Sequence, residues 1–263
     1  MKITIFTSNQ SRHNYLINLL TEVCDTLFVV QESRTILPGL VTDLYPESKI
    51  MKEYFLNVRN AQTKIFGEQT ISSKKSRLKL LPISAGDLNY LKLDQIPEFF
   101  ESDFYLVFGS SYIKNPLIDF LILKKAINIH MGVSPYYRGT DCNFWALFDN
   151  NVNLVGSTIH LLSKGLDNGP ILYHAMPYKV ADPFEYSMLA CKSAFYSIRD
   201  FLVSKNLASL VPVDQDKKLE IRYSKNIEFN DQVITKYKKI DIDIDHEFDE
   251  SVLINPYFLN SQQ

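Results

Sequence analysis

Short, mostly apolar segments that alternate with helical patterns are the feature of this sequence that most constrains its fold. Residues 2–7 (KITIFT) and 26–31 (TLFVVQ) have the length and composition of buried strands, and a helical stripe begins near residue 12, between them. Residues 104–108 (FYLVF) are apolar throughout, which is typical of a central strand in a parallel sheet. The strand–helix–strand opening therefore predicts an α/β fold with a Rossmann-like, doubly wound and mostly parallel sheet flanked by helices.

Helical patterns and a late change of composition indicate the domain organisation. Residues 48–67 and 184–205 carry apolar residues at helical intervals, which predicts two long helices packed on the core. The C-terminal part is richer in Lys, Asp, Asn, Ile and Tyr, and residues 238–248 alternate charged with apolar residues. That alternation predicts an exposed edge strand rather than a calcium loop. We expect a main domain over residues 1–208 and a small appendage over residues 209–263, docked on its own core or, in a homodimer, on a second copy.

The overall composition excludes several classes of protein. With 263 residues and a net charge of −2, the chain lacks the basic excess of a polyanion-binding protein, so no nucleic acid partner is expected. Its three cysteines, Cys24, Cys142 and Cys191, are widely spaced and odd in number, so we expect neither a metal site nor a disulfide framework. The chain opens on a strand rather than a signal peptide, and no apolar run reaches about 18 residues. These observations favour a cytoplasmic protein with no membrane partner.

Three polar residues at the ends of two apolar segments have chemistry suited to catalysis. The segment AINIH ends in Asn128 and His130, which share one face because alternate strand residues point the same way. A second segment, VGSTIHLL, leads into a polar turn that contains Asp167. If both loops leave the same sheet edge, a polariser, a titrating imidazole and a carboxylate come together. Such a set supports acyl transfer without a nucleophilic Ser or Cys, and the sequence places no base beside Cys142.

Taken in order, the motifs NIH, SPYYRG and GLDNGPIL resemble the folate-dependent formyltransferase family. That family has an Asn-x-His on one strand, a Pro-x-x-Arg-Gly loop and an Asp in a Gly-Leu-Asp-x-Gly turn. The resemblance covers roughly residues 1–205 and implies that the main domain is the catalytic domain, with Asn128, His130 and Asp167 as its catalytic set. One motif departs from the family pattern, because many members read Ser-Leu-Leu-Pro where this chain reads Gly132–Val133–Ser134–Pro135.

The resemblance also implies where the co-substrate binds. In the family, the loop after the central strand cradles the pterin of the folate through backbone groups. By this resemblance, Gly109, Ser111, Tyr112 and Ile113 bind 10-formyltetrahydrofolate; the other interpretation of these residues is a simple loop between a strand and a helix.

Other polar residues have two interpretations each. Asn9 and Gln10 follow the first strand, where doubly wound sheets bind ligands, so they are substrate contacts or only a helix N-cap region. Arg138 is a substrate contact or an anchor of its loop. His160 and His174 are expected to be packing or surface histidines rather than ligands.

On this hypothesis each catalytic residue has a role in moving a formyl group from a folate nitrogen to an amine. Asn128 donates a hydrogen bond to the formyl oxygen as negative charge develops on it. His130 stabilises that charge as imidazolium and shuttles protons between the entering and leaving nitrogens. Asp167 raises the pKa of His130 and helps to accept the amine proton.

Members of the family differ in the acceptor they use. The first loop lacks the glycines found in the purine-pathway relatives, and only about 58 residues follow residue 205. The layout is most similar to the sugar N-formyltransferases, which act on nucleotide-linked amino deoxysugars of surface polysaccharides such as lipopolysaccharide O-antigen. Two alternatives stay open: a methionyl-tRNA formyltransferase and a non-catalytic folate- or sugar-binding relative. The sequence does not distinguish dTDP, GDP and UDP.

Overall fold

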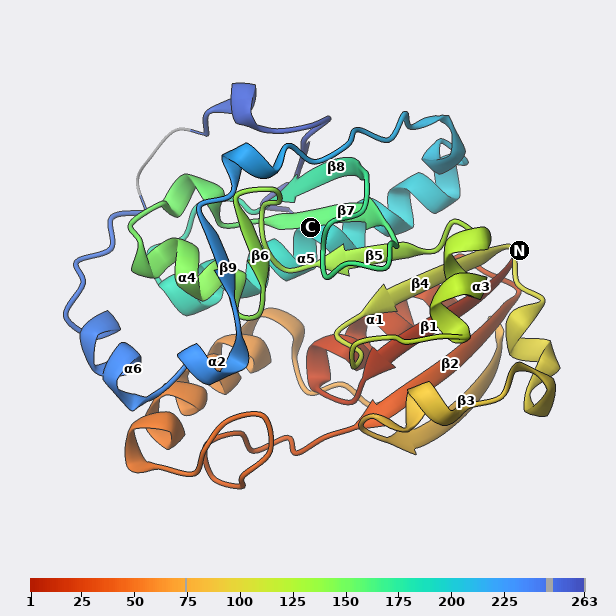
Figure 1. The fold of residues 1–263 in the computed structure, drawn as a ribbon, viewed down its shortest axis with the longest axis horizontal. Helices are drawn as coiled ribbons and strands as arrows, with labels where there is room; N and C mark the ends of the chain where they lie inside the picture. The colour runs from red at the N-terminus through yellow and green to blue at the C-terminus, as the bar shows by residue number, and fades with distance from the viewer. Residues whose placement is uncertain (74, 245–247, 263) are drawn as a thin grey trace.

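The computed structural model describes residues 1–73, 75–244 and 248–262, and its centre is one eight-stranded sheet. The strand order is β10-β8-β7-β5-β4-β1-β2-β3 (Figure 1). The run from β3 to β5 is parallel, β7 is antiparallel to both neighbours, and β10 is parallel to β8. The predicted Rossmann-like, mostly parallel α/β sheet is therefore confirmed. The strands are β1 (Lys2–Ser8), β2 (Thr26–Ser33), β3 (Arg77–Ser84), β4 (Phe104–Phe108), β5 (Ile127–His130), β6 (Tyr137–Gly139), β7 (Ser157–Leu161), β8 (Ile171–Met176), β9 (Arg222–Ser224) and β10 (Tyr257–Phe258).

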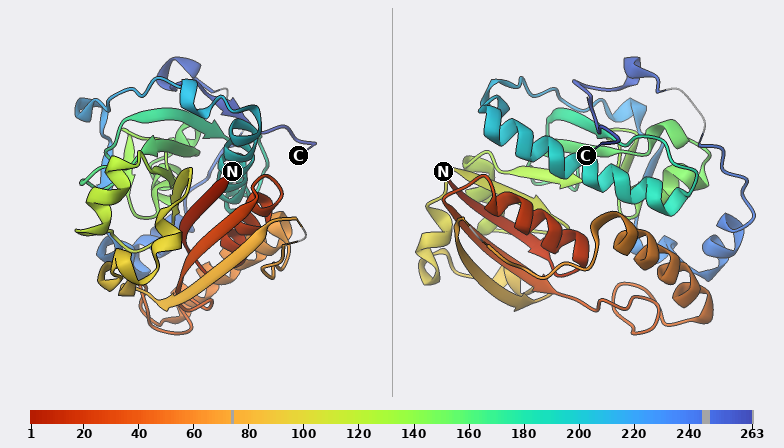
Figure 2. Two further views of the ribbon diagram at one scale, coloured as in Figure 1. Left: turned by 90° about the vertical axis from the view of Figure 1, so that its right-hand side faces the viewer. Right: turned by 180° about the vertical axis from the view of Figure 1, so that it is seen from behind.

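Helices cover both faces of this sheet, as its doubly wound connections require. One core joins alternate residues of β1, β2, β4 and β5 to α1 and α5. The opposite residues of β1, β2 and β4 pack on α3 and on short 3-10 helices between residues 87 and 100. The right-hand view of Figure 2, seen from behind, shows α5 crossing one face of the sheet. The α-helices are α1 (Ser11–Thr21), α2 (Lys49–Phe66), α3 (Leu117–Leu123), α4 (Cys142–Phe148), α5 (Pro183–Ser204) and α6 (Asp231–Tyr237). None of the helices in the described part of the chain combines the length and hydropathy that crossing a bilayer demands.

The C-terminal segment packs on the rest of its own chain. Its strand β9 pairs with β6, and β10 extends the central sheet beside β8. Phe229 and Ile234 are buried in a third core with α2 and α4. Of the two docking sites expected for this segment, the structure thus shows the chain's own core.

One predicted element is wrong. Residues 238–248 were expected to form an edge strand, but residues 238–244 contain no strand, and residues 245–247 lie outside the described part. Ile244 is instead buried in the third core, and Ile240 and Ile242 pack against it. The alternation of charged and apolar residues therefore reflects isoleucines that pack on a core, and not a strand at the edge of the sheet.

Candidate active site

A cavity of about 1150 Å³ lies where the carboxyl ends of β1, β4 and β5 meet the α2 and α4 helices. Loops that follow these strands line it, as expected for an open α/β sheet. The sequence-predicted residues Asn128, His130 and Asp167 all line this cavity. The fold therefore brings together residues that are 39 positions apart in the chain.

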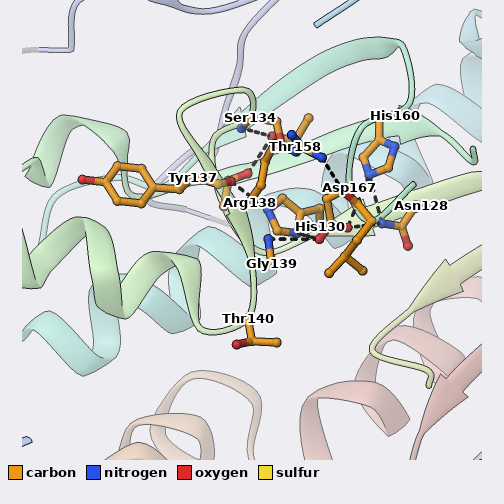
Figure 3. Close-up of polar contacts among 12 residues, drawn as sticks. Asn128, His130, Ser134, Tyr137, Arg138, Gly139, Thr140, Thr158, His160 and Asp167 are labelled. Atoms are coloured by element: carbon orange, nitrogen blue, oxygen red, sulfur yellow. Dashed lines mark hydrogen bonds and ion pairs between the residues drawn. The ribbon is translucent and has the colours of Figure 1, made fainter. Parts of the chain in front are cut away.

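Asn128 and His130 each contact Asp167 directly (Figure 3). Asn128 and His130 extend from the same face of β5, and Asp167 lies in the turn between β7 and β8 with a positive φ of 48°, which Asp tolerates better than most residues. Asp167 Oδ2 is 3.4 Å from His130 Nδ1, and Asp167 Oδ1 accepts a hydrogen bond from Asn128 Nδ2 at 3.2 Å. The backbone N–H of Gly139 also donates to Asp167, at 3.3 Å.

Two features of the surroundings of His130 have opposite effects on its protonation. Its hydrogen-bond acceptors favour the imidazolium, whereas its burial favours the neutral ring. Its Nε2 lies 3.1 Å from the carbonyl oxygen of Tyr137 and its Nδ1 faces Asp167, so only the imidazolium donates a hydrogen to both. Burial nevertheless lowers the pKa of His130, and this effect outweighs the opposing effect of the Asp167 charge. The predicted effect of the Asp167 charge on the pKa of His130 is therefore present, but burial outweighs it. The neutral imidazole can accept a proton, and two oxygens are in place to stabilise the ion that results.

Asp167 stays ionised in spite of its burial. Desolvation alone would raise its pKa, but the neighbouring His130 and His160 and the N–H of Gly139 together bring the pKa below its usual value. Gln215, from the C-terminal segment, holds the turn by donating to the carbonyl oxygens of Asp167 and Gly169 at 2.9 and 2.8 Å. The site therefore holds a fixed carboxylate beside a neutral imidazole.

His160 belongs to this site, although it was expected to be a packing or surface residue. It lies opposite Asn128 in the antiparallel β5–β7 pair, so the two side chains share a face. Its Nδ1 donates to the carbonyl oxygen of Leu161 at 2.8 Å, which leaves Nε2 to accept from Asn128 at 3.0 Å. Both amide hydrogens of Asn128 are thus bonded, one to His160 and one to Asp167. Only the register of β7 against β5 places His160 opposite Asn128, and the sequence alone does not give that register. His174, by contrast, is a packing histidine as predicted.

The loop predicted to bind the folate also lines the cavity. Gly109 has a φ of 64°, and a side chain there would meet His13 Nε2 at 2.7 Å, so this position requires glycine. The N–H of Ser111 donates to Glu32, the hydroxyl of Tyr112 donates to the carbonyl of Lys164, and Ile113 is buried. The loop is thus held in place on both sides, and it lines the same cavity as Asn128, His130 and Asp167.

The predicted substrate contacts have different surroundings. Asn9 and Gln10 line the cavity, but the amide of Asn9 is bonded to the backbone N–H and carbonyl of Arg34. Gln10 is the N-cap residue of α1, and its side chain makes no capping bond. Arg138 is not among the cavity-lining residues, and it donates to Glu220 at 2.7 Å and to the carbonyl of Leu166 at 2.8 Å. Its geometry therefore favours the loop anchor of the two roles considered.

The residues around the cavity do not form a metal site. Within residues 1–73, 75–244 and 248–262, no group of three or more His, Cys, Asp and Glu side chains is arranged to hold a metal ion. Cys142 is buried, and burial raises the pKa of its thiol well above the usual value, which disfavours the thiolate.

Fold and site together define an α/β protein with the framework of an acyl-transfer enzyme. Residues 105–182 match the family model described as formyl transferase. This match agrees with the family resemblance that the motifs carry, and it spans every residue of the predicted catalytic set. Comparison with curated proteins gives no match.

Solved structures of formyltransferases share the fold. A sugar N-formyltransferase from Shewanella sp FDAARGOS_354 is 16% identical, with 100% of this chain and 94% of that chain covered and a TM-score of 0.54. A 4-N formyltransferase from Francisella tularensis is 15% identical, with 99% and 93% covered and a TM-score of 0.51. An N-formyltransferase from Helicobacter canadensis, in complex with folinic acid and dTDP-3-aminofucose, is 14% identical, with 90% and 79% covered and a TM-score of 0.53.

Proposed function

We propose that this protein transfers a formyl group from 10-formyltetrahydrofolate to the amino group of a nucleotide-linked amino deoxysugar. The observation that carries the proposal is the contact of Asn128, His130 and Asp167 inside one large cavity. At about 1150 Å³, this cavity exceeds the roughly 300–1,000 Å³ of a pocket for one small ligand, as a reaction between two bulky substrates requires.

The catalytic residues divide the work between proton transfer and stabilisation of charge. The attacking amine must lose a proton, and ionised Asp167 accepts it directly or through water. His130 Nδ1, 3.4 Å from Asp167, takes the proton on and returns it to the departing folate nitrogen. The imidazolium formed in between stabilises negative charge on the formyl oxygen. Asn128 donates to the same oxygen by exchanging its 3.2 Å bond to Asp167 for one to the substrate, while its bond to His160 keeps the amide oriented.

The choice of acceptor rests on charge and on the solved structures that share the fold. With a net charge of −2, the chain lacks the excess of Lys and Arg that neutralises tRNA phosphates. A structure with the same fold holds folinic acid together with dTDP-3-aminofucose, so this architecture accommodates a folate and a nucleotide-linked amino sugar. We infer a role in the cytoplasmic assembly of surface polysaccharide such as lipopolysaccharide O-antigen. Homodimer formation stays a prediction that light scattering would test.

The experiment is a panel assay with mass spectrometry as the readout. The protein is incubated with 10-formyltetrahydrofolate and, in separate reactions, dTDP-, GDP- and UDP-linked amino sugars and initiator methionyl-tRNA. The proposal predicts the gain of one formyl group on an amino sugar. Formylation of the tRNA alone would overturn the acceptor, and no product with any acceptor would overturn the proposed reaction.

A further inference from the structure

The cavity continues past the catalytic residues to a second group of polar side chains. Gly139, which holds Asp167, is followed by Thr140 and Asp141, and both of these line the same cavity. Arg12 on α1 also lines it and donates to Gln62 on α2 at 2.7 Å. These residues therefore form a second polar region beside the catalytic one.

Three atoms of this region have no hydrogen-bond partner among the described residues. Arg12 Nε, Thr140 Oγ1 and Asp141 Oδ2 are each removed from solvent by the surrounding protein. Only the other carboxylate oxygen of Asp141 is bonded, accepting from the hydroxyl of Tyr45 at 2.7 Å. In Figure 3 the side chain of Thr140 lies apart from the bonded network of the catalytic residues. Buried polar atoms are almost always paired, so three unpaired atoms in one cavity indicate a polar ligand.

The walls around these atoms are aromatic. Tyr45, Tyr54, Phe55 and Phe144 all line the cavity, and the ring centroids of Tyr45 and Phe55 are 4.6 Å apart. Apolar and aromatic walls with a few fixed polar atoms are typical of small-molecule sites. A hexose fits this combination, because its carbon-bound hydrogens pack on aromatic rings while its hydroxyl groups both donate and accept hydrogen bonds.

We propose that Arg12, Thr140 and Asp141 form the subsite for the hexose ring of the acceptor. Asp141 Oδ2 accepts from a ring hydroxyl, Arg12 Nε donates to a ring or hydroxyl oxygen, and Thr140 Oγ1 bonds to a neighbouring hydroxyl. One cation and one carboxylate suit the hydroxyl groups of a sugar ring, which both donate and accept hydrogen bonds, whereas the carboxylate would repel a diphosphate. The inference rests on the proposed function and assigns the sugar, rather than the nucleotide, to these three residues.

Calorimetric binding tests the subsite without any need for turnover. The probes are dTDP-3-aminofucose, the corresponding GDP- and UDP-linked amino sugars, and free dTDP, GDP and UDP. The variant Asp141→Asn keeps the shape of the side chain, and Asn tolerates the positive φ of 56° at this position. The asparagine side chain has one carbonyl oxygen, which would have to accept hydrogen bonds from both Tyr45 and the ligand. Because hydrogen bonds to charged groups are the stronger ones, we expect the Kd of the preferred amino sugar to rise about tenfold or more.

Two further variants and the free nucleotides act as controls. Thr140→Val, which is nearly isosteric, should raise the same Kd by about three- to tenfold. Asp119→Asn removes an exposed carboxylate on α3, paired with Lys164 and outside the cavity, and should leave every Kd unchanged. The affinity of the matching free nucleotide should stay the same in all variants.

The outcomes separate this inference from the proposed function. Unchanged amino-sugar binding in both Asp141→Asn and Thr140→Val, or an equal loss of affinity for the free nucleotide, would overturn the subsite. Failure of the wild-type protein to bind any of the amino sugars would overturn it as well. Asp141-dependent binding of an amino sugar without formyl transfer would support the subsite and contradict the proposed reaction.

Discussion

His174 on β8 links the core to the C-terminal segment through a hydrogen-bond pattern that only a neutral ring satisfies. It is fully buried, its Nε2 donates to the carbonyl oxygen of Ser134 at 2.8 Å, and its Nδ1 accepts from the backbone N–H of Ile254 at 2.8 Å. A second proton would place one N–H against another. Burial accordingly lowers the pKa of His174 from 6.5 to about 4.

This shift makes the free energy of unfolding depend on pH in a predictable direction. Below pH 6.5 the unfolded chain binds a proton at His174 and the folded chain does not, so acid favours unfolding. Stability falls by about 1.4 kcal/mol per pH unit until the pH approaches about 4. At pH 5, roughly 1.5 units below the unfolded pKa, the loss from this one side chain is about 2 kcal/mol.

Urea unfolding of the wild type and of His174→Gln, at pH 7.5 and at pH 5.0, tests this calculation. The variant should be less stable at pH 7.5, because glutamine does not reproduce both hydrogen bonds. Its loss of stability between the two pH values should be smaller than that of the wild type by about 2 kcal/mol, since the other titrating groups are common to both proteins. Equal losses in the two proteins would refute the reasoning.

Other residues give predictions for turnover, folate binding and stability. His160→Ala frees one amide hydrogen of Asn128 and should lower kcat about tenfold with little change in either KM, measured by steady-state kinetics. Gly109→Ala meets both a φ of 64° and a contact of 2.7 Å with His13, so fluorescence titration should show folate binding weakened about tenfold or more, with Asp119→Asn, outside the cavity, as the unaffected control. Arg222→Lys loses a two-pronged bond to Asp149 and the contact with Trp145, which should cost about 1–3 kcal/mol in urea unfolding. An unchanged kcat, folate affinity or free energy of unfolding would count against the contact that the respective variant alters.

The sequence predicted the parts of the fold that depend on local pattern. The apolar segments at residues 2–7, 26–31 and 104–108 all became strands of the sheet, because continuous apolar runs have to be buried on both faces. Asn128 and His130 share a face for the same local reason, which is the two-residue period of a strand. That Asp167 lies close to these two residues was predicted from the motif and not from any local rule.

The parts that depend on long-range pairing were not predictable. His160 reaches Asn128 only through the register of β7 against β5, and β9 reaches β6 across more than 80 residues of chain. Asn9 was expected to contact substrate or to lie in an N-cap region, yet its amide holds the backbone of Arg34, which follows the neighbouring strand. His160 and Asn9 therefore have partners that become adjacent to them only when the sheet is assembled.

Transfer of an isotopically labelled formyl group tests the central claim most directly. The donor is 10-formyltetrahydrofolate labelled in the formyl carbon, the acceptor is the nucleotide-linked amino sugar, and mass spectrometry follows the label in the wild type and in His130→Ala. We expect one label per sugar with the wild type and a rate at least about 100-fold lower with the variant, with folate binding retained. Transfer by His130→Ala at the wild-type rate, or label recovered only as free formate, would contradict it.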